Sequence, residues 1–135
     1  MKRYLLDTGI AGEYIGNRGA VFACVYAEQA KGNHVGICVP VLAELVFGVE
    51  YSSSREINMR LLLKGLRTIR LWPFGKAEAF EYGRLNAHLR KAGRPMQVPD
   101  VMIAAVALLL GKCTVVSKDS DFLAVPGLAV ENWAA

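Results

Sequence analysis

The sequence predicts an α/β fold, in which a mostly parallel sheet of about five strands is flanked by helices. Short apolar segments alternate along the chain with longer segments whose apolar residues recur at helical spacing. The chain has 135 residues, of which 53% are hydrophobic. This is enough for one well-packed domain, which we expect to span residues 1–135.

The predicted strands are residues 4–6, 35–39, 69–72, 113–116 and 128–130. Pro40 and Pro73 follow the second and third of them and prevent their continuation. The predicted helices are residues 10–31, 41–51, 55–67, 76–91 and 99–110. The last is apolar on nearly all sides, so we expect it to be buried. The first is the least regular because it contains Gly12, Gly16 and Gly19.

Composition excludes several classes of protein. The longest apolar stretch is too short to cross a membrane, and no export signal precedes the first strand. The three cysteines, Cys24, Cys38 and Cys113, are far apart and lie among apolar residues, which indicates reduced thiols rather than a zinc site. We therefore expect a cytoplasmic protein. A net charge of +4 permits a polyanionic partner but does not require one.

Four acidic residues are predicted to meet at one edge of the sheet. Asp7 directly follows the first strand, and Asp119 comes just after the fourth. Glu44 lies near the start of the helix after the second strand, and Asp100 follows Pro99 at the start of the last helix. Strands end and helices begin at the same edge of a parallel sheet, which is where ligands bind in such folds.

Each acid also has a purely structural interpretation. Asp7 is placed to cap a helix, Asp100 to complement a helix N-terminus, and Asp119 and Asp121 to form turns. Glu44 is harder to explain in this way. Its helical neighbours three and four positions away are all non-polar, so we expect its carboxylate to face the protein, where an unpaired charge is costly.

Crowded carboxylates point to a metal ion. Two of them within about 4 Å repel each other by about 4 kcal/mol at an effective dielectric constant near 20, and a divalent cation removes that cost. Oxygen ligands suit Mg²⁺, with Mn²⁺ as the alternative, rather than zinc. Such a site can hydrolyse phosphodiester bonds without a histidine, cysteine or serine nucleophile.

Three other functions share parts of this pattern. Asp7, Thr8 and Gly9 spell the signature of aspartic proteases, but those enzymes consist almost entirely of strands. A phosphatase with Asp7 as the nucleophile needs a second aspartate at position 9, where this chain has glycine. A binding module that holds RNA or a basic peptide in the acidic pocket without cutting it remains an alternative.

The chain resembles PIN-domain ribonucleases, in particular the VapC-type toxins of prokaryotic toxin–antitoxin pairs. The resemblance spans essentially the whole chain. It is carried by "YLLDTG" at 4–9, "PVLAELVFGV" at 40–49, "VPDVMIAAVALLLG" at 98–111 and "VVSKDSDFLAVPGLAVENW" at 115–133.

The resemblance implies a PIN-like nuclease domain that cleaves RNA endonucleolytically. Asp7, Glu44, Asp100 and Asp119 would form the acidic metal-binding pocket, and Asp121 is a candidate fifth member. Asp7 and Asp100 match the positions usually regarded as Mg²⁺ ligands. The expected partners are an RNA substrate, a small cognate antitoxin that places a peptide in or near the pocket, and a second copy of the chain.

The chain departs from the family pattern at two positions, neither of which removes a carboxylate. Gly9 stands where asparagine is common, and Ser117 replaces a frequent threonine while keeping the hydroxyl group. We therefore expect activity to be retained.

Three arginines are candidate RNA ligands: Arg84, Arg90 and Arg94 lie on and after one predicted helix, which leads to the loop before Asp100.

Overall fold

Five parallel strands form the central sheet of the computed structural model, which describes residues 1–134. Their bounds are β1 Arg3–Leu6, β2 His34–Cys38, β3 Arg70–Trp72, β4 Cys113–Val116 and β5 Ala129–Glu131. They lie in the order β3-β2-β1-β4-β5, and every neighbouring pair is parallel. The predicted fold class is confirmed.

The strands are connected by six α-helices and one short 3-10 helix within the described residues. Their bounds are α1 Thr8–Ile15, α2 Val21–Ala30, α3 Val39–Tyr51, α4 Arg55–Leu66, α5 Lys76–Lys91, α6 Val98–Leu110 and the 3-10 helix η1 Ser120–Ala124. The single helix expected over residues 10–31 is wrong. The chain turns between α1 and α2, where Asn17 and Gly19 have positive φ angles of 52° and 64°.

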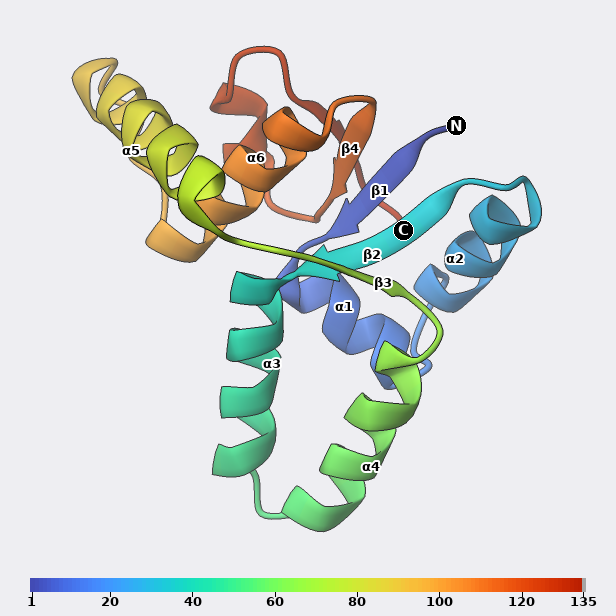
Figure 1. Ribbon diagram of the computed structural model, residues 1–135. Coiled ribbons are helices and arrows are strands. Elements are labelled where there is room, and N and C mark those ends of the chain that lie inside the picture. The colour runs from blue at the N-terminus through green and yellow to red at the C-terminus, as the bar shows by residue number, and fades with distance from the viewer. Residues whose placement is uncertain (135) are drawn as a thin grey trace.

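The helices cover both faces of the sheet (Figure 1). From β1 to β3 the chain crosses the sheet in one direction, and it then returns past β1 to begin β4. Because such crossovers are right-handed, α1–α4 lie on one face and α5 and α6 on the other. The strand order therefore reverses between β1 and β4, and ligands of open parallel sheets bind at such a switch point.

The core is centred on β1 and α6. Leu5 and Leu6 of β1 are fully buried, as are Val101 and Ile103 of α6. Burial of each large apolar side chain contributes roughly 1.5–3 kcal/mol. The expectation that the last helix is buried is confirmed, and this helix carries Asp100 on its first turn. A rigid element therefore positions that carboxylate.

The three cysteines are free thiols, as the sequence indicates. Burial raises the pKa of Cys38 to about 11 and that of Cys113 to about 12. Both thiols are therefore protonated at neutral pH and act as small core side chains. No helix within residues 1–134 combines the length and the apolar character that a membrane crossing requires.

Candidate active site

Asp7 lies at the switch point, directly after β1. Its Oδ1 accepts a hydrogen bond of 2.9 Å from the backbone N–H of Ile10, so the residue caps α1. Its Oδ2 accepts a hydrogen bond of 2.6 Å from the hydroxyl of Ser117, which follows β4. The structural role that the sequence suggested for Asp7 is real, but it occupies only one oxygen. The carboxylate is held from both sides of the switch point.

Ser117 connects two of the acidic residues. Its side chain is almost completely buried, with 3% of the residue exposed, and its Oγ accepts a hydrogen bond of 2.9 Å from the backbone N–H of Asp119. One hydroxyl therefore binds the Asp7 carboxylate and the backbone of the Asp119 loop. The sequence alone does not predict this role for Ser117. The available signal is a polar residue directly after a buried apolar strand.

Asp119 and Asp121 lie on the loop after β4. The Oδ1 of Asp119 accepts a hydrogen bond of 2.9 Å from the backbone N–H of Asp121, which caps η1. The turn-forming role is therefore present here as well. Both carboxylates remain exposed, so they are open to a ligand. Glu13 of α1 forms an ion pair of 2.5 Å with Lys118 and ties this loop to α1.

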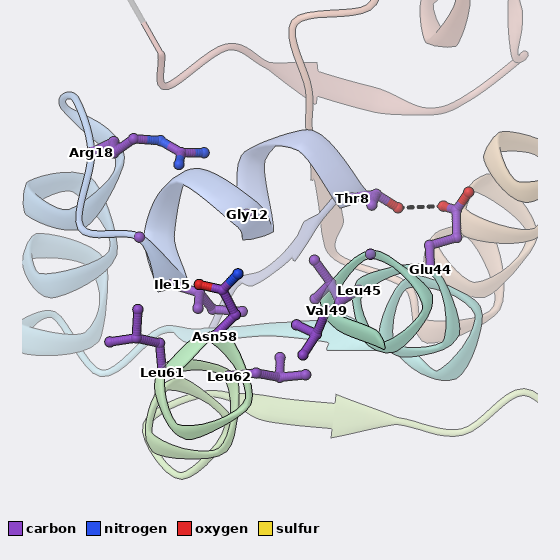
Figure 2. A pocket seen from close by; sticks show the side chains of 12 residues that line it. Thr8, Gly12, Ile15, Arg18, Glu44, Leu45, Val49, Asn58, Leu61 and Leu62 are labelled. Atoms are coloured by element: carbon purple, nitrogen blue, oxygen red, sulfur yellow. Dashed lines mark hydrogen bonds between the residues drawn. The ribbon is translucent and has the colours of Figure 1, made fainter. Parts of the chain in front are cut away.

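Glu44 is exposed, and the expectation that its side chain faces the protein interior is wrong. On α3 the only buried residue is Val41, which belongs to the core. Of the other neighbours of Glu44, Gly48 lines a groove and Phe47 is exposed. The carboxylate accepts a hydrogen bond from the hydroxyl of Thr8, the first residue of α1 (Figure 2). This contact directs Glu44 toward the end of β1, where Asp7 lies.

Asp100 is surrounded by the other acidic residues. Burial, followed by the negative charges of Asp119, Asp7, Glu44 and Asp121, raises the pKa of Asp100 to about 6. All five acids singled out from the sequence therefore contribute to one electrostatic cluster, which we call the acidic site. Burial also raises the pKa of Asp7, although the hydrogen bonds from Ser117 and Ile10 oppose this shift.

The side chains do not form a ready-made metal centre. Within residues 1–134, no three histidine, cysteine, aspartate or glutamate side chains come close enough together to hold an ion as they stand. The donor set itself is of the kind that Mg²⁺ prefers, since every member is a carboxylate. Repulsion separates carboxylates that have no cation between them. Metal binding therefore stays a prediction.

The three candidate RNA-binding arginines have different surroundings. Arg90 lines a hollow of about 340 Å³ that Asp121 also lines, together with the loop before α6. Arg84 is ion-paired with Glu81 on its own helix, so its charge is partly neutralised. Arg94 is exposed on that loop. Of the three, Arg90 is the one that shares a hollow with a member of the acidic site.

A groove of about 570 Å³ extends from the acidic site between α1, α3 and α4 (Figure 2). Thr8 and Glu44 lie at one end of it, and Arg18 and Asn58 line it further away. Its apolar lining residues are Ile15, Leu45, Val49, Leu61 and Leu62. We call this feature the α1–α3–α4 groove. It joins an apolar channel to a carboxylate of the site.

Comparison with known protein families shows which family has this arrangement of acidic residues. The family model described as the PIN domain matches residues 4–128. The chain belongs to the PIN-domain family. The likeness noted from the sequence is therefore confirmed, and the matched span includes all five acidic residues.

Relatives of this PIN domain include VapC proteins from several bacteria. "Ribonuclease VapC2" of Rickettsia felis is 31% identical over 130 residues, which cover 96% of this chain and 97% of the relative. "tRNA(fMet)-specific endonuclease VapC" of Shigella flexneri is 30% identical over 136 residues, which cover 99% of this chain and 100% of the relative. These full-length matches place the chain in the VapC branch of the family.

Solved structures agree with this placement. The VapBC2 complex of Rickettsia felis, bound to a DNA fragment from its promoter, contains a chain with a TM-score of 0.89 and 30% identity, and the match covers 97% of this chain and 98% of that one. DNA-bound VapBC from Salmonella typhimurium gives a TM-score of 0.88 at 25% identity, with 98% and 99% covered. The PIN fold of this chain is thus shared along its full length.

Proposed function

We propose that this PIN domain is a metal-dependent endoribonuclease and the toxin of a toxin–antitoxin pair. The observation that carries the proposal is the acidic site, in which Asp100 lies within the electrostatic field of four other carboxylates at the switch point of the sheet. The RNA-cleaving activities for which the relatives are named support the choice of substrate.

The residues present fit a hard divalent cation. Asp7 and Asp100 would hold it, because both are half-buried and are positioned by β1 and α6. Glu44 and Asp119 would complete the shell around it, with Asp121 at its margin. A bound Mg²⁺ supplies positive charge that offsets the carboxylates and the scissile phosphate, and it activates water for hydrolysis.

The chain's own hydroxyl groups prepare this site. Ser117 and Thr8 donate hydrogen bonds to Asp7 and Glu44, which orients one oxygen of each carboxylate. Asp7 and Glu44 therefore enter the reaction with their side chains already ordered. Because Asp119 is bound to Ser117 through its backbone, its loop takes its position from the same hydroxyl.

Arg90 is the RNA ligand that we favour among the three arginines. It makes no ion pair within residues 1–134, and its hollow adjoins Asp121. A guanidinium group there would bind a backbone phosphate beside the scissile bond. Arg84 and Arg94 would contribute more weakly, Arg84 because Glu81 already neutralises it.

Cleavage of a labelled tRNA by purified protein tests the proposal. We expect cleavage with Mg²⁺ and none with EDTA. Asp7→Asn and Asp100→Asn should each lower the rate by about a hundredfold or more, since they remove charge that holds the cation. Circular dichroism should show that both variants are folded.

A matched control removes an acid elsewhere. Glu56 is on α4, its side chain is 81% exposed, and it does not belong to the acidic site. Glu56→Gln should therefore cleave like the wild-type protein. Cleavage that persists in EDTA, or in clean Asp100→Asn protein, would exclude the metal-dependent mechanism.

The α1–α3–α4 groove is the docking site that we propose for an antitoxin. VapBC complexes among the solved neighbours support the existence of such a partner. The groove has an apolar floor and ends at Glu44. An amphipathic segment with one basic side chain matches that pattern, because the basic group would reach the acidic site.

Two copies of the chain would form the toxin's homodimer, which light scattering of the purified protein tests.

A further inference from the structure

The charge of the molecule is divided between the two edges of the sheet. The acidic site lies where the strands end. Where they begin, Arg3, His34 and Arg70 are the first residues of β1, β2 and β3, and Lys112 directly precedes β4. With Arg67, which follows α4, these residues form what we call the basic edge. Four residue steps along β2 separate the two edges, about 13 Å at 3.3 Å per residue.

The basic edge contains a hollow of about 540 Å³ between the end of α2 and the start of β3. Its lining residues are Gln29, Asn33, His34, Val35, Arg67, Thr68, Ile69 and Arg70. None of them is acidic. Arg67 and Arg70 form no ion pair within the described part of the chain. The side-chain amide of Asn33 donates a hydrogen bond to the carboxylate of Glu28. That carboxylate is already paired with Lys31 at 3.2 Å.

His34 orients one of these arginines. Its Nε2 lies 3.1 Å from Nη2 of Arg70, and because a guanidinium group can only donate, the imidazole accepts this hydrogen bond and its proton is on Nδ1. Desolvation and the charges of Arg70, Arg3 and the N-terminal amine lower the pKa of His34. The ring is therefore neutral at pH 7, and the field in this hollow is positive.

The backbone beside the hollow is closely packed. A side chain on Gly36 of β2 would place its Cβ 2.5 Å from the carbonyl oxygen of Arg70. Glycine at this position lets β3 pair with β2, with Gly36 opposite Arg70. The start of β3, and with it Arg70, is therefore held by the sheet and not by a loose loop.

We propose that the basic edge is a second RNA-binding surface, which binds backbone phosphates of the substrate away from the point of cleavage. Arg3 of β1 lies opposite His34 of β2 and Cys113 of β4; Arg70 contacts His34, and Lys112 directly precedes Cys113. Because neighbouring strands lie about 4.8 Å apart, Arg70, Arg3 and Lys112 are spread along this edge, which suits a chain of phosphates better than a single carboxylate. RNA as the ligand rests on the proposed ribonuclease function. The acidic site repels RNA, so a cationic surface elsewhere is needed to hold it.

Binding of a fluorescent RNA, followed by anisotropy in EDTA over a range of salt concentrations, tests this proposal. We expect the Arg67→Gln, Arg70→Gln double variant to bind about tenfold more weakly at moderate salt. Two lost phosphate contacts should lower the slope of log K against log salt by about 1.4. Arg60→Gln removes one positive charge from the exposed surface of α4 and should leave the slope unchanged.

Three results would overturn the proposal. The first is a double variant that is folded and keeps the wild-type salt slope. The second is an equal loss of affinity in Arg60→Gln, which would indicate a general effect of net charge. The third is competition by polyglutamate as effective as that by RNA of equal charge, which would make the hollow a site for an acidic peptide. Because anisotropy measures binding and the EDTA removes divalent cations, these outcomes are independent of whether the protein cleaves RNA.

Discussion

The hydroxyl of Ser117 donates a hydrogen bond of 2.6 Å to Oδ2 of Asp7, across 110 positions of the chain. The two residues follow β1 and β4, the strands between which the sheet order reverses. The same hydroxyl accepts a hydrogen bond from the backbone N–H of Asp119. Ser117 therefore helps to fix the positions of two acidic residues. Its hydroxyl acts through these two residues, so we regard Ser117 as a positioning residue.

Ser117→Ala should lower the cleavage rate by about 10- to 100-fold, the usual cost of losing an outer-shell partner at a metal site. Ser117→Thr keeps the hydroxyl and should restore most of the activity. A pH profile separates positioning from a merely structural role. The hydrogen bond lowers the pKa of Asp7, so its loss should move the acid limb of the rate profile to higher pH. An unmoved acid limb in folded Ser117→Ala protein would contradict this role.

Asp100→Asn should stabilise the metal-free protein at pH 7. The pKa of Asp100 is raised from 3.8 in the unfolded chain to about 6 in the folded one, so the folded state binds the proton more tightly. The contribution of protonated Asp100 to the free energy of unfolding is fully present below about pH 4 and is lost as the pH rises through 6. The pKa shift limits the gain in free energy of unfolding to at most about 3 kcal/mol. Solvent screening reduces this gain to the order of 1 kcal/mol.

Melting curves in EDTA at pH 7 and pH 4 measure this effect. A gain of about 1 kcal/mol corresponds to a rise of about 4 °C in Tm for a domain of this size. The difference between Asp100→Asn and the wild-type protein should become much smaller at pH 4, where Asp100 is neutral in the folded protein and only partly ionised in the unfolded chain. A difference that is the same at both pH values would show that it does not come from the charge of Asp100.

Leu61→Glu should weaken binding of the antitoxin. Leu61 lines the α1–α3–α4 groove, and a charge there would lie against the apolar face of the bound segment. Leu63 is on the same helix and is similarly exposed, 51% against 43%, but it does not line the groove. Leu63→Glu is therefore a matched control.

Calorimetric titration with the cognate antitoxin gives the two affinities. We expect the Leu61→Glu complex to be at least about tenfold weaker and the Leu63→Glu complex to be nearly unchanged. Equal affinities for both variants would place the antitoxin elsewhere on the toxin.

The fold was predictable because its elements have strong local signals. Pro99 marks the start of α6, and the uniformly apolar residues after it indicate burial. The division of residues 10–31 into two helices was not predictable in this way. Alanine and apolar residues continue through the segment, while the turn depends on positive φ angles at Asn17 and Gly19 that composition alone does not specify.

The site was predictable in its residues and less so in its contacts. Parallel topology brings the ends of β1 and β4 together, so Asp7 and Asp119 had to be neighbours. The exposure of Glu44 could not be deduced, because apolar residues near it on the helix have different surroundings: Val41 lies in the core, whereas Phe47 is exposed. The role of Ser117 depends on a hydrogen bond between distant parts of the chain, for which no local pattern exists.

Two helical glycines should respond in opposite ways to replacement by alanine. A Cβ on Gly83 of α5 would have no atom within 4 Å, whereas a Cβ on Gly65 of α4 would lie 2.9 Å from Cγ1 of Ile15. Gly83→Ala should therefore stabilise the protein by about 0.5–1 kcal/mol, the difference in helix propensity. Gly65→Ala should be destabilising, because Ile15 must move and α4 lies against α1 there. Urea denaturation measures both changes. Ile15 also lines the α1–α3–α4 groove, so Gly65→Ala should in addition weaken antitoxin binding. Gly83→Ala should leave that binding intact. Equal stabilisation of the protein by both substitutions would mean that α1 and α4 are not in close contact in solution.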